Sequence, residues 1–195
     1  ANGAGSIAMN EHVSKGHLSA WGVPFVPEQL VQTPVEAVAA AMHIGFPVVL
    51  KAVSSTLLHK SDAGAVILNI GSEEQLRTAW ARIVENVEAC GGDHTLDGMI
   101  VARQISGGVE MVLGLHRDPE AGLVLMAGAG GIWLELFKDV AFAVPPVTKE
   151  KALDMLGRTK SAALLKGYRG SPVCDINALA DAVVALGTFA SHAGE

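Results

Sequence analysis

The sequence predicts an α+β fold with two lobes, and three observations support this prediction. The first half alternates capped helical segments with apolar strand-like runs, whereas the second half begins as a meander of short strands and ends in helices. Between the halves, residues 103–108 contain the turn-forming glycines typical of a hinge. Of the 195 residues, 50% are hydrophobic and 17% are charged, a composition that favours a well-buried core over a disordered chain.

The first lobe is expected to span residues 10–104, after a flexible tail or linker remnant of small residues at 1–9. Capping signals mark its helix starts, because Thr33 precedes a proline and Ser72 stands three residues before Gln75. The almost entirely apolar run at 47–53 is typical of a central strand buried on both faces. The predicted elements are helices at 10–22 and 34–44, an extended segment at 24–30, strands at 47–53, 65–70 and 99–104, and a helix from Ser72 to Gly91-Gly92.

The second lobe is expected to span residues 105–195 and to contain an antiparallel meander followed by helices. Glycine-rich turns separate its short apolar runs, and Pro145-Pro146 ends the meander. The predicted elements are strands at 109–115, 123–127, 132–137 and 141–144, helices at 148–156 and 159–165, a loop at 167–170, and a final helix capped by Asp175.

Charge and residue usage exclude several classes of protein. The net charge of −6 argues against a nucleic-acid-binding face, which requires clustered positive charge. The two cysteines, Cys90 and Cys174, lack C-x-x-C spacing, and the seven histidines lack the H-E-x-x-H pattern, so neither a disulfide scaffold nor a zinc site is expected. No apolar run approaches the roughly 18 residues that a membrane span needs, and no signal peptide is recognisable. We therefore expect a cytoplasmic protein.

The stretch at residues 47–70 carries the strongest chemical signal. An apolar run ends in Lys51, and the following polar loop contains His59, Asp62 and Gly64 before a second apolar run. A strand can fix the ammonium as a point charge for phosphate, the imidazole is a competent nucleophile, and a glycine lets backbone N–H groups approach an anion. The alternatives are a lysine that only caps the sheet, a surface histidine, and an ordinary turn without a ligand.

Together with downstream motifs, this stretch resembles the ATP-grasp domain of the NDP-forming acyl-CoA synthetases. That family includes the β subunit of ADP-forming acetyl-CoA synthetase, and succinyl-CoA synthetase is a more distant relative. The matching motifs are P-V-V-L-K, H-K-S-D-A-G, V-E-M-V-L-G at 109–114, R-D-P at 117–119, G-A-G-G at 128–131, L-E-L-F-K-D-V-A-F at 134–142 and R-G at 169–170. They are collinear and extend from about Glu11 to the end of the chain. The resemblance implies an ATP-grasp fold that holds ATP or ADP with Mg²⁺ between two lobes, with the adenine near the hinge.

The resemblance also assigns roles to individual residues. His59 matches a histidine that accepts the phosphoryl group, and Asp62 could orient its imidazole or simply cap a turn. The positions implied to bind nucleotide are Lys51, Arg103, Gln104, Glu110, Gly128, Gly130 and Gly131. The positions that could lie near phosphate or metal are Lys60, Glu135, Asp139 and Arg169. Structural alternatives remain for these positions. The glycines could form strand corners, Glu135 and Asp139 could form ion pairs at the surface, and Arg169 could only hold its loop in place.

The function that the resemblance implies is ATP-dependent ligation of a carboxylate to CoA, through an acyl phosphate and a phosphohistidine. The family's metal-ligand strand, D-x-N-P, would follow Glu195, so the ligands for the metal are unknown here and we expect the isolated chain to be inactive. CoA-binding and CoA-ligase domains, or an α subunit, are the implied partners. Two departures from the family pattern, at Ala65 and Ala121, concern local loop geometry. The alternatives are an ATP-grasp region of a protein-acetyltransferase fusion and a non-catalytic docking lobe.

Overall fold

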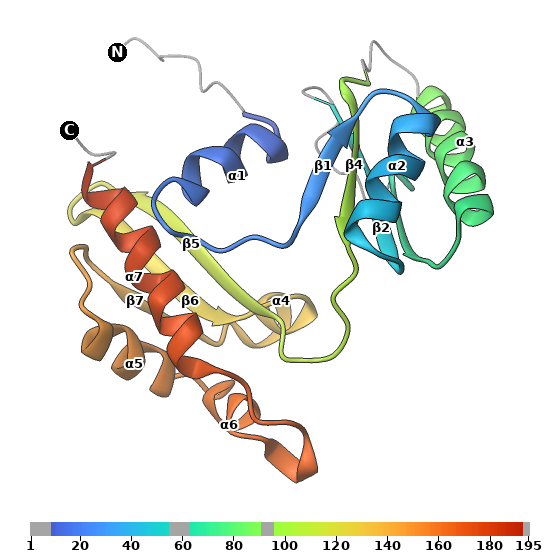
Figure 1. Cartoon of the computed structure of the whole chain (residues 1–195). Coiled ribbons are helices and arrows are strands. Elements are labelled where there is room, and N and C mark those ends of the chain that lie inside the picture. Colours follow the sequence, from blue (N-terminus) through green and yellow to red (C-terminus); the bar gives the residue numbers. More distant parts are fainter. Residues whose placement is uncertain (1–8, 55–62, 91–95, 193–195) are drawn as a thin grey trace, which may run out of the picture. The chain divides into compact units, whose positions relative to one another are not determined.

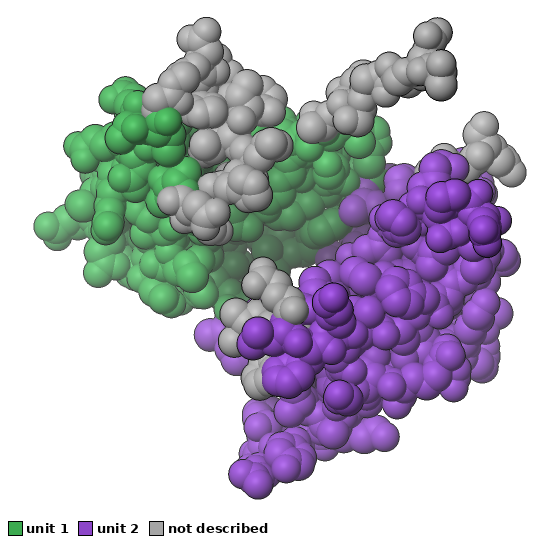
Figure 2. Space-filling model, turned by 180° about the vertical axis from the view of Figure 1, so that it is seen from behind, with its two compact units in different colours: residues 1–17, 25–105 green, residues 18–24, 106–195 purple. Residues whose placement is uncertain are grey.

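A computed structural model describes residues 9–54, 63–90 and 96–192 of the chain (Figure 1). The chain divides into two compact units, one comprising residues 1–17 with 25–105 and the other residues 18–24 with 106–195 (Figure 2). Each unit contains helices and an antiparallel sheet, which confirms the predicted α+β class. Within the described ranges, no helix combines the length and the apolar character needed to cross a membrane.

Unit 1 is a four-stranded antiparallel sheet in the order β1-β4-β2-β3, with two helices packed on one face. Figure 1 shows these two helices, α2 and α3, side by side. The elements are α1 (Glu11–Ser19), whose first residues belong to this unit, β1 (Glu28–Val31), α2 (Pro34–Ile44), β2 (Val48–Val53), β3 (Val66–Ile70), α3 (Glu73–Ala89) and β4 (Gly98–Arg103). The predicted caps are confirmed, because the Thr33 and Ser72 hydroxyls accept hydrogen bonds from the N–H groups of Glu36 and Gln75.

Strand β2 lies between β4 and β3, so the prediction of a central strand is confirmed. All of its residues are buried except Lys51, which is half-buried. Val48, Leu50 and Ala52 join the core beneath α2 and α3. Because side chains alternate along a strand, Lys51 belongs to the opposite face, where its cross-strand neighbour Ile100 packs in a smaller cluster. The lysine therefore lies on the face of the sheet that α2 and α3 do not cover.

The edge strand β3 carries a bulge next to β2, since Val48 pairs with Ile70 but Leu50 pairs with Ile67. The extra residue is accommodated by Asn69, whose φ of 58° lies in the left-handed region that asparagine tolerates better than most residues. The Asn69 N–H donates to the Gln104 side-chain carbonyl over 3.1 Å. This bond ties the bulge to the chain segment that leaves β4.

Unit 2 is a three-stranded antiparallel meander, β5-β6-β7, with α5 and α7 packed against one face through Leu125, Met155 and Val183. The elements are β5 (Met111–Asp118), β6 (Gly122–Ala129), α4 (Ile132–Phe137), β7 (Val140–Ala143), α5 (Lys149–Gly157), α6 (Ala162–Leu165), the 3₁₀ turn η1 (Tyr168–Gly170) and α7 (Ile176–His192). The Thr148 hydroxyl accepts a hydrogen bond from the N–H group of Lys151, and the Asp175 carboxylate accepts one from the N–H group of Ala178, which confirms both predicted caps.

Two predictions for unit 2 are wrong. The run at 132–137, predicted as a strand, forms the short helix α4. A short apolar run does not by itself distinguish a strand from a buried helix, and the left-handed backbone at Gly131 and Lys138 turns the chain at both ends of this run. In addition, the strand predicted at 123–127 continues to Ala129, so that Gly128 lies inside β6, opposite Val140 of β7.

Candidate functional site

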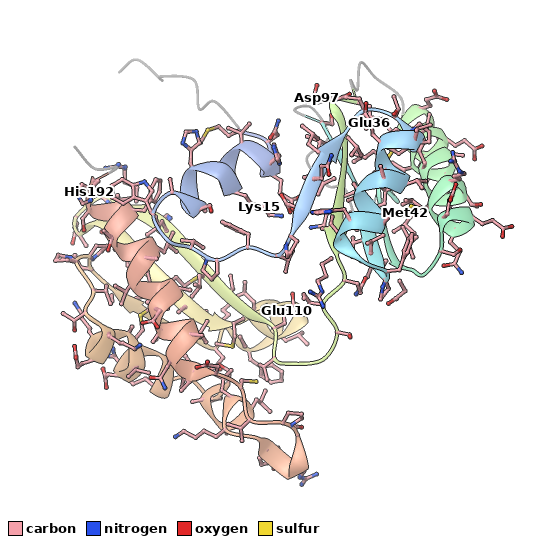
Figure 3. All side chains as sticks on the ribbon, viewed as in Figure 1. Lys15, Glu36, Met42, Asp97, Glu110 and His192 are labelled. Carbon is pink, nitrogen blue, oxygen red and sulfur yellow. The ribbon has the colours of Figure 1, made fainter. Side chains whose placement is uncertain are left out.

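The predicted phosphate-binding lysine lies in a chain of alternating charges in unit 1. The Lys51 ammonium lies 3.0 Å from a carboxylate oxygen of Glu11, in the first turn of α1. The same Glu11 oxygen accepts a hydrogen bond from Lys15 over 2.7 Å, and Lys15 in turn contacts Glu28 of β1 over 2.6 Å. Figure 3 labels Lys15 on α1. These ion pairs tie the start of α1 to strands β1 and β2.

Burial and ion pairing act in opposite directions on these charges. Burial alone would raise the pKa of Glu11, but the hydrogen bonds from Lys15 and Lys51 outweigh it and lower the pKa to about 2. Burial likewise opposes the charge on Lys15, yet Glu11 and Glu28 raise its pKa above the usual value. Both groups are therefore charged at neutral pH. The Nδ1 atom of His12 lies 3.7 Å from a Glu28 oxygen.

The predicted catalytic loop falls outside the described residues, and with it His59, Lys60 and Asp62. The structure describes the residues that flank this loop. Ser54, directly after β2, is buried. On the other side, the Gly64 carbonyl accepts a hydrogen bond from the Asn86 side chain over 2.8 Å, and a Cβ on Gly64 would lie 2.6 Å from that side-chain nitrogen. The loop thus begins and ends at positions packed against unit 1.

The two residues of the predicted hinge that were expected to bind nucleotide, Arg103 and Gln104, differ in their surroundings. Arg103 ends β4 with an exposed side chain, and its backbone N–H donates to the Pro27 carbonyl over 3.0 Å. Gln104 uses its side-chain oxygen to hold Asn69 and its side-chain nitrogen to donate to the Ile105 carbonyl. The amide group of Gln104 is therefore engaged in two hydrogen bonds within this segment, whereas Arg103 is exposed.

In unit 2 the structure brings Glu110 together with two of the predicted glycines. The Glu110 carbonyl accepts a hydrogen bond from the Gly130 N–H over 2.8 Å, and a Cβ on Gly131 would lie 2.6 Å from a Glu110 carboxylate oxygen. Figure 3 labels Glu110 directly before β5. An adjoining hollow of about 590 Å³ is lined by Glu110, Gly131, Leu164 and Cys174 among others. The φ of 56° favours glycine at position 131, whereas the Glu110 carboxylate is the end of a flexible side chain.

Gly128 has a different explanation. A Cβ on this residue would overlap the Asp139 carbonyl oxygen and would lie 2.8 Å from the Cα of Val140. Both atoms belong to the backbone of the neighbouring chain segment that forms β7. The absence of a side chain at Gly128 therefore serves the pairing of β6 with β7, and the backbone geometry accounts for this glycine without a ligand.

Asp139 also has a described structural partner. Its two carboxylate oxygens accept hydrogen bonds from the N–H groups of Lys160 and Ser161, over 2.7 and 2.8 Å. Burial would raise the pKa of Asp139, but these backbone hydrogen bonds lower it overall. The side chain of its expected partner, Glu135, lies outside the described residues. Asp139 thus anchors the chain before α6.

Arg169 lies in the 3₁₀ turn η1, with a left-handed φ of 52°. Its guanidinium carbon is 5.4 Å from the centre of the Tyr168 ring, and both side chains are exposed. Tyr168, Phe137 and Leu164 line a mostly apolar hollow of about 390 Å³. Stacking on Tyr168 restrains Arg169 locally, as the loop-anchor alternative supposes.

The described ranges contain no group of three or more potential metal ligands. The prediction from sequence missed Glu11 as the partner of Lys51 and Lys15 as the second partner of Glu11. Their spacing of four residues on a helix is a recognisable signal for an ion pair with each other. Nothing in the local pattern connects either residue with Lys51, which lies 40 residues away from Glu11.

Comparisons with known proteins show to which family the chain is similar. The family model of the ATP-grasp domain matches residues 1–195. The chain is 41% identical over 180 residues to the β subunit of acetate–CoA ligase (ADP-forming) I of Pyrococcus furiosus, covering 92% of this chain and 78% of that subunit. It is 42% identical over 177 residues to trans-feruloyl-CoA synthase from an unknown prokaryotic organism, covering 91% of this chain but only 25% of that protein.

Solved structures agree with these matches. Acetyl-coenzyme A synthetase 1 of Ca. Korarchaeum cryptofilum, in complex with coenzyme A and Ca-AMPCP, superimposes with a TM-score of 0.92 at 39% identity, covering 96% of this chain and 82% of that one. A second structure of that enzyme gives a TM-score of 0.82 at 38% identity and covers 96% of this chain and 80% of that one. It contains coenzyme A and Mg-AMPPCP, and its phosphohistidine segment points towards the nucleotide binding site. The chain belongs to the ATP-grasp domain family.

Proposed function

We propose that this chain is the nucleotide-binding module of an NDP-forming acyl-CoA synthetase, which converts a carboxylate, CoA and ATP into acyl-CoA, ADP and phosphate. The observation that carries the proposal is Lys51, a lone charged residue in an otherwise buried central strand, whose ammonium belongs to the sheet face opposite α2 and α3. The names of the relatives at 41 and 42% identity support the reaction class. The bound Ca-AMPCP and Mg-AMPPCP of the Korarchaeum enzyme support ATP and ADP as ligands.

The contribution of this chain is positioning and charge neutralisation, which dominate catalysis of phosphoryl transfer. Lys51 would donate hydrogen bonds to the phosphates, and Glu110, an exposed carboxylate beside Gly130 and Gly131, would face the ribose or a bound cation. Mg²⁺ would supply neutralising charge at the phosphates when bound. Both oxygens of Asp139 accept backbone hydrogen bonds, so this carboxylate already has a structural role in the segment before α6.

We assign the covalent step to His59. An imidazole nitrogen would attack the γ-phosphorus of ATP, so that an N–P bond forms while the bond from phosphorus to the departing ADP oxygen breaks. A phosphohistidine segment in the Korarchaeum enzyme supports this type of intermediate. Lys60 would offset part of the added charge of about −1.5 to −2, by analogy with other phosphorylated side chains, and Asp62 would hold the neutral imidazole in its attacking tautomer.

The share of each relative that this chain covers indicates which other domains or subunits would act with it. The chain spans a quarter of trans-feruloyl-CoA synthase but 78% of the Pyrococcus β subunit. We infer that the parent protein, a cytoplasmic enzyme, unites it with CoA-binding and CoA-ligase domains, either in one chain or through an α subunit. Those parts would bind the acid and CoA, and the residues of this chain do not identify the acyl group.

Labelling with γ-³²P-ATP tests the proposal in the full-length enzyme that contains this chain. We expect acid-labile, base-stable label on the peptide that contains His59, and its loss in His59→Gln together with loss of ATP-dependent acyl-CoA formation. His43→Gln, which alters an exposed histidine of α2, is the matched control and should leave both unchanged. Label found only on other peptides, with His59→Gln still active, would remove the covalent role from His59.

A further inference from the structure

The carboxylate of Glu11 is shared between two lysines. Its Oε1 lies 3.0 Å from the Lys51 nitrogen and 2.7 Å from the Lys15 nitrogen. Lys15 is held independently by Glu28, over 2.6 Å. The charges of these four side chains cancel, and each side chain is at most 28% exposed. Glu11 is thus fixed by Lys15 and by its helix, and it holds the ammonium of Lys51.

Restraint of Lys51 matters because a lysine side chain has a flexible stem of four methylene groups and loses much conformational entropy when its ammonium is immobilised. An ammonium has three N–H donors. Among the described residues, Glu11 is the hydrogen-bond acceptor of Lys51, which takes one donor and leaves two for another acceptor. A carboxylate held in this way restrains the lysine without consuming its capacity to bind phosphate.

We propose that Glu11 is a positioning residue for Lys51, whose carboxylate fixes the ammonium so that its remaining N–H donors meet the phosphates in the transition state. The inference rests on the proposed phosphate-binding role of Lys51. Glu11 therefore acts through Lys51 and touches no reacting atom. Without Glu11 the ammonium of Lys51 keeps its charge and therefore most of its ground-state attraction for the phosphates. The cost of losing Glu11 falls mainly on kcat, because a restrained donor contributes most where charge develops.

Glu11→Gln in the full-length enzyme tests the inference, since it keeps the size of the side chain and removes its charge. We expect kcat to fall about fivefold to tenfold with a KM for ATP within about twofold of wild type. Glu11→Asp, which keeps the charge but withdraws it by one methylene, should recover part of the loss. Glu73→Gln is the matched control, because Glu73 lies in the first turn of α3 and pairs with Arg77 four residues on, as Glu11 does with Lys15. It should leave kcat unchanged.

A double-mutant cycle with Lys51→Met separates positioning from a general effect on stability. If Glu11 acts through Lys51, the effect of Glu11→Gln disappears in the Lys51→Met background. Three results would overturn the inference. The first is an effect of Glu11→Gln that has the same size in both backgrounds, and the second is a wild-type kcat in Glu11→Gln. The third is a lowered KM for ATP, because it would show that the carboxylate competes with phosphate for Lys51. Should Glu11→Gln fail to fold, Glu11→Asp decides by the same cycle. If Lys51→Met itself leaves the kinetics unchanged, the proposed role of Lys51 fails instead.

Discussion

Gly128→Ala tests whether this glycine serves the fold. The new Cβ would overlap the Asp139 carbonyl oxygen and would lie 2.8 Å from Val140 Cα, both backbone atoms that no rotamer change can move. The β6–β7 pair must open, which costs about 1–3 kcal/mol of overpacking and endangers the hydrogen bond from Ala129 N–H to Asp139, worth about 1 kcal/mol. We therefore expect unit 2 to lose about 2–4 kcal/mol of unfolding free energy.

The assay is equilibrium urea unfolding followed by tryptophan fluorescence in a Trp80→Phe background, since the remaining two of the three tryptophans belong to the residue ranges of unit 2. Gly114→Ala in the same sheet is the control. A Cβ there meets only the terminal methyl of Met126 at 3.5 Å, an ordinary contact, and should change stability by less than about 0.5 kcal/mol. Equal unfolding midpoints for wild type, Gly114→Ala and Gly128→Ala would refute the reasoning.

Three further predictions follow from the described contacts. Because ion pairing lowers the pKa of Glu11 from 4.5 to about 2, its carboxylate stabilises unit 1 above pH 4.5 and loses this effect as the pH falls towards 2. Urea titrations of the wild type should show that the unfolding free energy falls by up to about 3 kcal/mol across that window, and the profile of Glu11→Gln should be flatter. Asp139→Ala leaves the N–H groups of residues 160 and 161 without their acceptor and should speed hydrogen exchange at those residues, whereas unchanged exchange would contradict the anchor. Asn69→Gly should fold as well as wild type, and Asn69→Val should lose about 1–2 kcal/mol on thermal unfolding, because a β-branched residue resists positive φ.

Local chemistry explains which elements the sequence predicts well. Thr33, Ser72 and Thr148 each place a hydroxyl where it can accept a hydrogen bond from the first turn of a helix, and all three helices begin there. The buried run of β2 is equally local, since a strand buried on both faces needs nearly continuous apolar residues. Such features depend on neighbours within a few residues, and these neighbours are visible in the sequence.

The remaining features depend on partners far along the chain. The run at 132–137 is apolar in either conformation, and the turns at Gly131 and Lys138 select a helix. Gly128 was predicted as a nucleotide-binding position, and its contact with the backbone at Asp139 and Val140 has no signature in the local sequence. The pairing of Lys51 with Glu11 likewise joins residues 40 positions apart. The candidate residue Lys51 could thus be predicted from the sequence, whereas its contact with the Glu11 carboxylate required the structure.

The affinity of the full-length enzyme for Mg-ATP, measured by isothermal titration calorimetry in Lys51→Met, tests the central claim most directly. One charge-assisted phosphate contact contributes about 1.5–3 kcal/mol, which predicts roughly 10- to 150-fold weaker binding. Lys149→Met, which breaks the exposed ion pair of Lys149 with Asp181 in unit 2, is the control and should bind like wild type. Wild-type affinity in Lys51→Met, with an unchanged melting profile, would contradict the assignment of Lys51 to the nucleotide phosphates.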